Sequence, residues 1–261
     1  MYPVLFRIGG FRLDSYDVLW LIALSLAILW SLRRLRLYDV DEQEARRVIG
    51  WAFLAMLLGA AAFKPLWKFR TFAANPSLIL TQGGLSEVGA VAGAFLAAFL
   101  LCRRNPRISF QRLCDVAALP AFLAIAVGRW GCFLNGCCVG IESGFSLALH
   151  FPRDPAGVLR HPTQLYYSAL AALCLVLLLL VERRLLKRGP AEGGRYYALV
   201  APLALILYAL MRFSVDWLRA VEEPESGLAL SAWVLLAALP LECLWLIHSV
   251  RARRRAAGLS R

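Results

Sequence analysis

Seven long apolar runs, separated by short polar intervals, constrain this chain more than any other feature of its sequence. Each run approaches the length of about 20 residues that an α-helix needs to cross a lipid bilayer. Hydrophobic residues make up 60% of the chain, whereas about half is usual in a soluble domain. We therefore predict an all-α integral membrane protein, one domain over residues 1–261, with seven transmembrane helices at Tyr16–Leu32, Val48–Phe63, Leu85–Leu101, Leu113–Val127, Leu165–Val181, Tyr196–Met211 and Leu228–His248.

The basic residues indicate how the chain is oriented. Of the 29 Lys and Arg residues, 19 follow the first, third, fifth and seventh runs. Loops rich in Lys and Arg face the cytoplasm, so we expect the N-terminus outside and the C-terminus in the cytoplasm. Because this alternation accounts for the net charge of +12, a nucleic-acid partner is not indicated.

The stretch Gly128–Gly140 has an unusual composition for a transmembrane segment. It contains Arg129, Asn135, three cysteines and four glycines directly after an apolar run. A charge within a membrane is costly, and glycine lets a backbone or a ligand approach closely. We expect this stretch to form a binding site rather than to continue the helix. The predicted topology brings it to the outer face together with segments beginning at His161 and Arg212.

Three arginines at this face are candidates for binding a phosphate. Arginine binds phosphate through two hydrogen bonds at once, and phospholipid is the most abundant phosphate at that depth. The alternative is that Arg129, Arg212 and Arg219 simply extend to the headgroup region. Asp216 follows Arg212 by four residues, a spacing that predicts an ion pair on one helix face.

The segment that opens the fifth run carries polar groups of its own. His161 precedes the predicted helix and is a candidate base or hydrogen-bond donor, although a lone histidine is more often structural. Gln164 and Tyr166 bring polar side chains into the same turn, and Thr163 is a candidate N-terminal cap.

Three of the seven cysteines share the glycine-rich stretch. Cys132 could form a disulfide with Cys137 or Cys138 on an oxidising outer side. A reactive thiolate favoured by Arg129 is a second alternative, and simple packing is a third. We predict no metal site, because the sequence does not clearly supply further ligands. The other four cysteines lie in or beside apolar runs, where packing is expected.

At these segments the chain resembles the prolipoprotein diacylglyceryl transferase family of bacterial membrane enzymes. The resemblance rests on ordered motifs: an early Ser15-Tyr16, a Gly-Gly-Leu-Ser before the third run, GRxGxFxNG ending at Gly136, HPTQLY from His161 to Tyr166, and RFxxDxxR from Arg212 to Arg219. The resemblance implies a multi-pass protein of the bacterial inner membrane that moves diacylglyceryl from phosphatidylglycerol to a cysteine thiol of a preprolipoprotein.

The resemblance also implies roles for individual residues. Arg129 and Arg212 hold the phosphate and stabilise charge on the leaving group. The remaining residues line the lipid pocket or support the arginines: Tyr16, Asn135, Gly136, Gly140, Gln164, Tyr166, Asp216 and Arg219. No cofactor or metal is implied.

The sequence departs from the family pattern at positions that bear on catalysis. The histidine of the family's SFHGG segment is replaced by Val88, and the acidic residue that usually follows the Asn-Gly pair is Cys137. Given these departures, the first hypothesis is a transferase of this family in which Glu87 or His161 supplies the base. The alternatives are a paralogue with another acceptor or with redox chemistry at its thiols, and a phospholipid-binding protein without activity.

Overall fold

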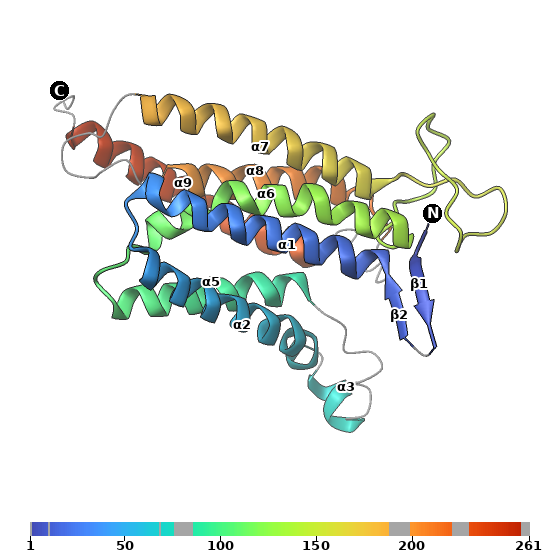
Figure 1. Ribbon diagram of the computed structural model, residues 1–261. Helices are drawn as coiled ribbons and strands as arrows, with labels where there is room; N and C mark the ends of the chain where they lie inside the picture. Colours follow the sequence, from blue (N-terminus) through green and yellow to red (C-terminus); the bar gives the residue numbers. More distant parts are fainter. Residues whose placement is uncertain are drawn as a thin grey trace. The chain divides into compact units, whose positions relative to one another are not determined.

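The computed structural model describes residues 2–9, 11–67, 69–75, 86–187, 199–220 and 230–256. Within these residues, seven long helices follow an N-terminal β-hairpin (Figure 1). They form two compact units, residues 1–33 with 114–261 and residues 34–113. That residues 1–261 form one domain stays a prediction. The elements are β1 (Val4–Ile8), β2 (Phe11–Asp14), α1 (Ser15–Arg34), a 3-10 turn (Leu35–Tyr38), α2 (Glu42–Trp67), α3 (Phe69–Ala74), α5 (Glu87–Arg104), α6 (Phe110–Asn135), α7 (Thr163–Lys187), α8 (Val200–Asp216) and α9 (Leu230–Ala256).

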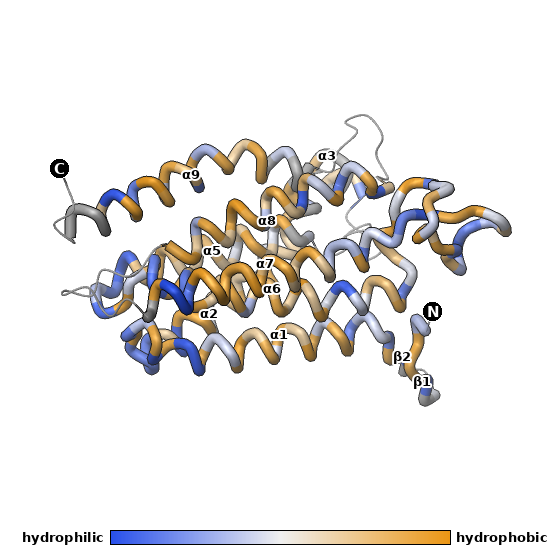
Figure 2. Tube along the Cα trace, turned by 90° about the horizontal axis from the view of Figure 1, so that it is seen from above, coloured by the Kyte–Doolittle hydropathy of each residue, from blue (hydrophilic) through white to orange (hydrophobic). Residues whose placement is uncertain are grey.

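The helices have the length and surface of membrane-embedded segments. Hydrophobic residues run along most of their lengths, and hydrophilic residues gather near their ends (Figure 2). Large apolar side chains such as Leu21 and Leu241 are exposed, as expected where lipid replaces water. Five segments are long and apolar enough to cross a membrane: Ser15–Tyr38, Glu42–Phe63, Phe110–Asn135, Thr163–Leu185 and Leu235–Ala252. The chain is thus a helical membrane protein.

The other two long helices, α5 and α8, coincide with the predicted third and sixth runs. Their described parts contain 18 and 17 residues. The beginnings of the predicted runs at Leu85, Tyr196 and Leu228 lie outside the described residues.

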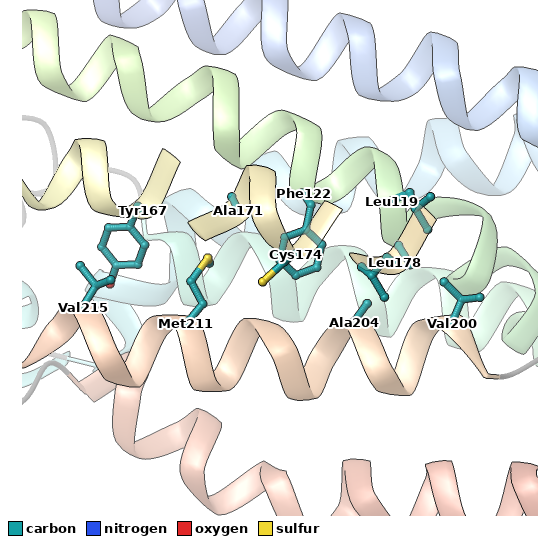
Figure 3. Close-up of a cluster of buried hydrophobic side chains, with 11 residues drawn as sticks. Leu119, Phe122, Tyr167, Ala171, Cys174, Leu178, Val200, Ala204, Met211 and Val215 are labelled. Atoms are coloured by element: carbon teal, nitrogen blue, oxygen red, sulfur yellow. The ribbon is translucent and has the colours of Figure 1, made fainter. Parts of the chain in front are cut away.

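The larger unit packs around one face of α7. Tyr167, Ala171, Cys174 and Leu178 recur at helical spacing and are buried against side chains of α6 and α8 (Figure 3). Since lipid gives no hydrophobic drive for helix association, close packing holds such helices together. Cys174 has the packing role expected from its sequence position.

The smaller unit is held by contact between α2 and α5. A Cβ on Gly89 would overlap the carbonyl oxygen of Gly59, and one on Gly93 would overlap that of Ala55. Gly89 and Gly93 are four residues apart in the sequence, a spacing of small residues that lets another helix approach closely.

The residues before α1 form an antiparallel hairpin. Ile8 pairs with Phe11, and Phe6 pairs with Leu13. The sequence between the two strands is Gly9-Gly10, and Gly9 has a φ of 56°, which glycine adopts without steric cost. Two glycines between apolar stretches are a known hairpin signal.

Candidate functional site

Helix α6 continues through most of the glycine-rich stretch, which corrects the expectation that the helix stops at Val127. It ends at Asn135. The Gly136 N–H donates to the Phe133 carbonyl and the Cys137 N–H to the Cys132 carbonyl, both at 3.1 Å. With Gly136 at a φ of 68°, these two bonds form a Schellman motif, a common way to satisfy the last carbonyls of a helix.

Glycines are tolerated inside α6 because α1 packs against them. A Cβ on Gly128 would lie 2.8 Å from the Trp20 ring, and one on Gly131 would lie 3.2 Å from the Cα of Tyr16. These glycines therefore serve helix contact rather than chain reversal. Tyr16 itself is 38% exposed, so its backbone makes this contact and its ring remains accessible.

A buried cluster of charged and aromatic groups joins α6, α7 and α8. The Arg129 guanidinium carbon lies 4.3 Å from the centre of the Tyr167 ring, and that of Arg212 lies 5.5 Å from it. The Arg212 Nε donates to Asp216 Oδ2 at 2.9 Å, which confirms the predicted ion pair. The Tyr167 hydroxyl donates to Asp216 Oδ1. The ring of Tyr167 thus contacts both guanidinium groups.

Burial of this cluster excludes the interfacial alternative for two of the arginines. Arg129 and Arg212 are only 5% and 3% exposed, and Asp216 is fully buried, so these side chains do not extend to the surface. Arg219 is more accessible, and its Nη1 lies 4.0 Å from Asp216 Oδ1.

The segment after α6 is tied to the start of α7. Thr163 Oγ1 donates to the Cys138 carbonyl and Gln164 Nε2 to the Cys137 carbonyl, both at 2.6 Å. Thr163 is the first residue of α7, so its hydroxyl serves this link rather than the predicted cap. Gln164 Oε1 is buried and has no hydrogen-bond partner in the described part of the chain.

Gly140 lies where three chain segments meet. Its N–H donates to the His161 carbonyl at 2.9 Å, and the flanking residues pair with the chain around Arg219. A Cβ on Gly140 would lie 2.6 Å from the Leu218 carbonyl oxygen and 2.7 Å from that of His161. Neither oxygen belongs to a flexible side chain, so only glycine fits. The His161 Nδ1 lies 3.1 Å from the Tyr166 hydroxyl.

The three cysteines of this stretch gather at the end of α6. All are free thiols, so the alternative of a disulfide is not realised in this structure. Their sulfur atoms lie within 4.8 Å of one another, and Arg219 Nη2 donates to the Cys138 sulfur at 3.4 Å. Hydrogen bonds from the Cys132 and Cys137 thiols, together with the charge of Arg219, lower the pKa of Cys138.

The larger unit therefore brings together most of the predicted site. Asn135 and Gly136 form the end of α6 beside the thiols. Glu87 is not among these residues, because it begins α5 in the smaller unit and its side chain lies outside the described part.

Sequence reasoning missed Tyr167, which contacts both arginines and Asp216. The sequence feature that could have identified it is its position on the apolar face of α7, four residues before Ala171 and seven before Cys174. A tyrosine on a buried face needs a hydrogen-bond partner.

Comparison with known proteins places this chain in a family. A model of the family described as prolipoprotein diacylglyceryl transferase matches residues 3–247. A phosphatidylglycerol–prolipoprotein diacylglyceryl transferase of Clostridium novyi is 30% identical over 257 residues, which cover 95% of this chain and 96% of the relative. The enzyme of the same name from Pseudomonas fluorescens strain Pf-5 is 29% identical over 94% of this chain and 89% of its own length. The chain therefore belongs to the prolipoprotein diacylglyceryl transferase family.

Proposed function

We propose that this chain transfers the diacylglyceryl group of phosphatidylglycerol to the cysteine thiol of a prolipoprotein in the bacterial inner membrane. Its family and the names of its relatives support this function. In the proposed topology all seven long helices cross the membrane, the N-terminus lies outside, and the site faces outward, where the signal peptide of the preprolipoprotein presents its cysteine.

The observation that carries the proposal is the pair of guanidinium groups on Tyr167. Arg129 and Arg212 approach one ring from α6 and α8, and two such groups bind the oxygens of one phosphate in the geometry that arginine prefers. As the bond between the glycerol carbon and the phosphate oxygen breaks, negative charge grows on the departing glycerol phosphate. Cations fixed at that position stabilise the charge as it develops.

The neighbouring residues position the arginines and the headgroup. Asp216 orients Arg212 through their 2.9 Å bond. The buried Gln164 Oε1 accepts a hydrogen bond from a hydroxyl of the glycerol headgroup. Tyr16, Asn135, Gly136 and Gly140 shape the pocket wall.

The proposed base that takes the thiol proton is His161, which lies in the larger unit; Glu87, the other candidate from the sequence, belongs to the smaller unit. His161 serves if its Nδ1–H donates to the Tyr166 hydroxyl, because Nε2 then keeps its lone pair for a proton. The thiolate sulfur attacks the glycerol carbon, a thioether forms, and glycerol phosphate leaves.

The test is transfer of labelled diacylglycerol from phosphatidylglycerol to a lipobox peptide by purified protein. Arg129→Ala is expected to lower transfer by at least about 100-fold, the size of losing one stabilising donor of developing charge. Arg153→Ala, in an exposed loop of the same unit, is the matched control and leaves transfer unchanged. Equal activity in the two variants contradicts the proposed phosphate site.

A second candidate rests on the gathered thiols, namely a paralogue that acts on another acceptor or carries out redox chemistry. Loss of activity in Cys137→Ser, at normal protein level, favours this candidate, whereas the transferase proposal expects activity to be kept. If the protein binds phosphatidylglycerol through Arg129 and Arg212 yet modifies no peptide, it is a phospholipid-binding protein instead.

A further inference from the structure

The cysteine cluster has the composition and size of a metal site. Three sulfur atoms lie within 4.8 Å of one another. Around a zinc ion with bonds of about 2.3 Å, three sulfur atoms are about 3.8–4.0 Å apart. The thiols therefore need to close by less than about 1 Å, which small side-chain rotations supply.

The backbone fixes the three positions without help from the thiols. The Schellman motif sets Cys137 beside Cys132, because its bond joins the N–H of one to the carbonyl of the other. Cys138 has a φ of 60°, a left-handed conformation that is strained in residues with a side chain. The bonds from Thr163 and Gln164 to the two carbonyls hold this geometry.

The surroundings suit a cluster of thiolates around a cation. Cys132 is only 3% exposed, whereas Cys137 and Cys138 are half-buried, so solvent reaches part of these two residues. Three thiolates and a divalent cation carry a net charge of −1. The guanidinium of Arg219, 3.4 Å from the Cys138 sulfur, offsets that charge at close range.

We propose that Cys132, Cys137 and Cys138 together bind one thiophilic d10 cation of the zinc class. Each thiol releases its proton to solvent as its sulfur–metal bond forms, and no group changes its oxidation state. Water completes the coordination of the ion. The site ties the end of α6 to the chain that leads into α7, and it goes beyond the proposed transfer reaction.

The experiment uses full-length protein in detergent, reduced and freed of metal, with Cd²⁺ as the probe. Cadmium–thiolate bonds absorb in the ultraviolet, and the absorbance grows with the number of thiolates. We expect one Cd²⁺ per chain with the absorbance of three thiolates, displaced by excess Zn²⁺. Serine at any one of the three positions should remove a third of the signal and weaken binding by about 100-fold or more, since even indirect disturbance of a metal site costs 10–100-fold.

Cys243→Ser is the matched control, because this cysteine lies apart in sequence on α9; its binding should equal that of the unaltered chain. A second measurement needs no variant. Zn²⁺ should protect three cysteines of the unaltered chain from alkylation, identified by mass spectrometry as these three. This keeps the proposal testable if a serine variant fails to fold.

Several results overturn the proposal. One is a Cd²⁺ signal that persists in all three serine variants, and another is alkylation that Zn²⁺ leaves unchanged. A third is a disulfide at Cys132 in protein taken from membranes without reductant, because two of the three ligands are then consumed. No lipid or peptide is present in these measurements, so their failure leaves the transferase proposal standing, and a lack of transfer does not affect them.

Discussion

Replacement of Tyr167 by phenylalanine tests whether the hydroxyl of this residue holds the arginine cluster in place. The variant keeps the ring against which Arg129 and Arg212 lie, at 4.3 and 5.5 Å from its centre. It removes only the hydrogen bond to Asp216. A hydrogen bond to a charged group contributes about 1.5–3 kcal/mol, and the site is buried, so water does not replace the lost donor. We expect the free energy of unfolding to fall by about that amount.

The same substitution should slow the reaction. The arginines are then held less firmly where they stabilise the transition state. If this raises the activation free energy by about 1.4 kcal/mol, kcat/KM for diacylglyceryl transfer falls about tenfold. Unfolding in mixed detergent micelles measures the first effect, and the transfer assay measures the second. Tyr166→Phe is the matched control for stability, because its hydroxyl contacts His161 Nδ1 at a partly exposed site, where a typical hydrogen bond contributes only about 0.5–1.5 kcal/mol.

A double-mutant cycle with Asp216→Asn decides whether the hydroxyl acts through Asp216. Asp216→Asn alone deprives Arg212 of its buried charge partner and should cost about 3–5 kcal/mol. In that background Tyr167→Phe should cost clearly less than in the unaltered chain. Additive effects within about 0.5 kcal/mol would refute the reasoning, because the two side chains would then act independently.

Two further predictions concern Gly140 and Cys138, which lie in the segment after α6. Gly140→Ala should abolish transfer and lower the yield of folded protein, because its Cβ would meet two backbone oxygens, whereas Gly144→Ala, with open space around it, should be neutral in the same assays. Because the pKa of Cys138 is lowered in the folded protein, its thiolate persists at pH values below the usual thiol pKa. Its contribution to the free energy of unfolding is lost only as the pH falls through the lowered pKa. Metal-free protein should therefore be alkylated at Cys138 at pH 6 far faster than at Cys243, and Arg219→Met should reduce that rate; equal rates at the two cysteines would show that the thiolate is not stabilised.

Much of the helical fold was predictable because lipid imposes simple rules on sequence. A span must be apolar along its length, so the helix positions follow from hydrophobic runs. Close helix contact needs small side chains, and Gly89 and Gly93 provide them where α5 meets α2. The pair of Arg212 and Asp216 followed from helical spacing alone.

The parts that could not be predicted depend on contacts between distant segments. The glycines Gly128 and Gly131 indicated a break in α6, yet they are helical because Trp20 and Tyr16 of α1 pack against them. Composition does not distinguish a glycine that turns the chain from one that admits a neighbouring helix. The disulfide alternative brought Cys132 to one other cysteine, but the approach of all three thiols could not be predicted. It depends on the helix ending at Asn135 and on Thr163 holding Cys138 in a left-handed conformation.

The continuation of α6 to Asn135 also sets the depth of the proposed phosphate site. Arg129 lies six residues before that end, about 9 Å along the helix axis. Arg212 lies four residues before the end of α8, about 6 Å along its axis. An anion held by both is therefore set back from the loops. A lipid can bring its phosphate to the depth of the two arginines while its acyl chains remain among the helices. A soluble phosphate ester must first lose its hydration water to reach that depth. The depth of the site therefore favours membrane-borne donors over soluble ones.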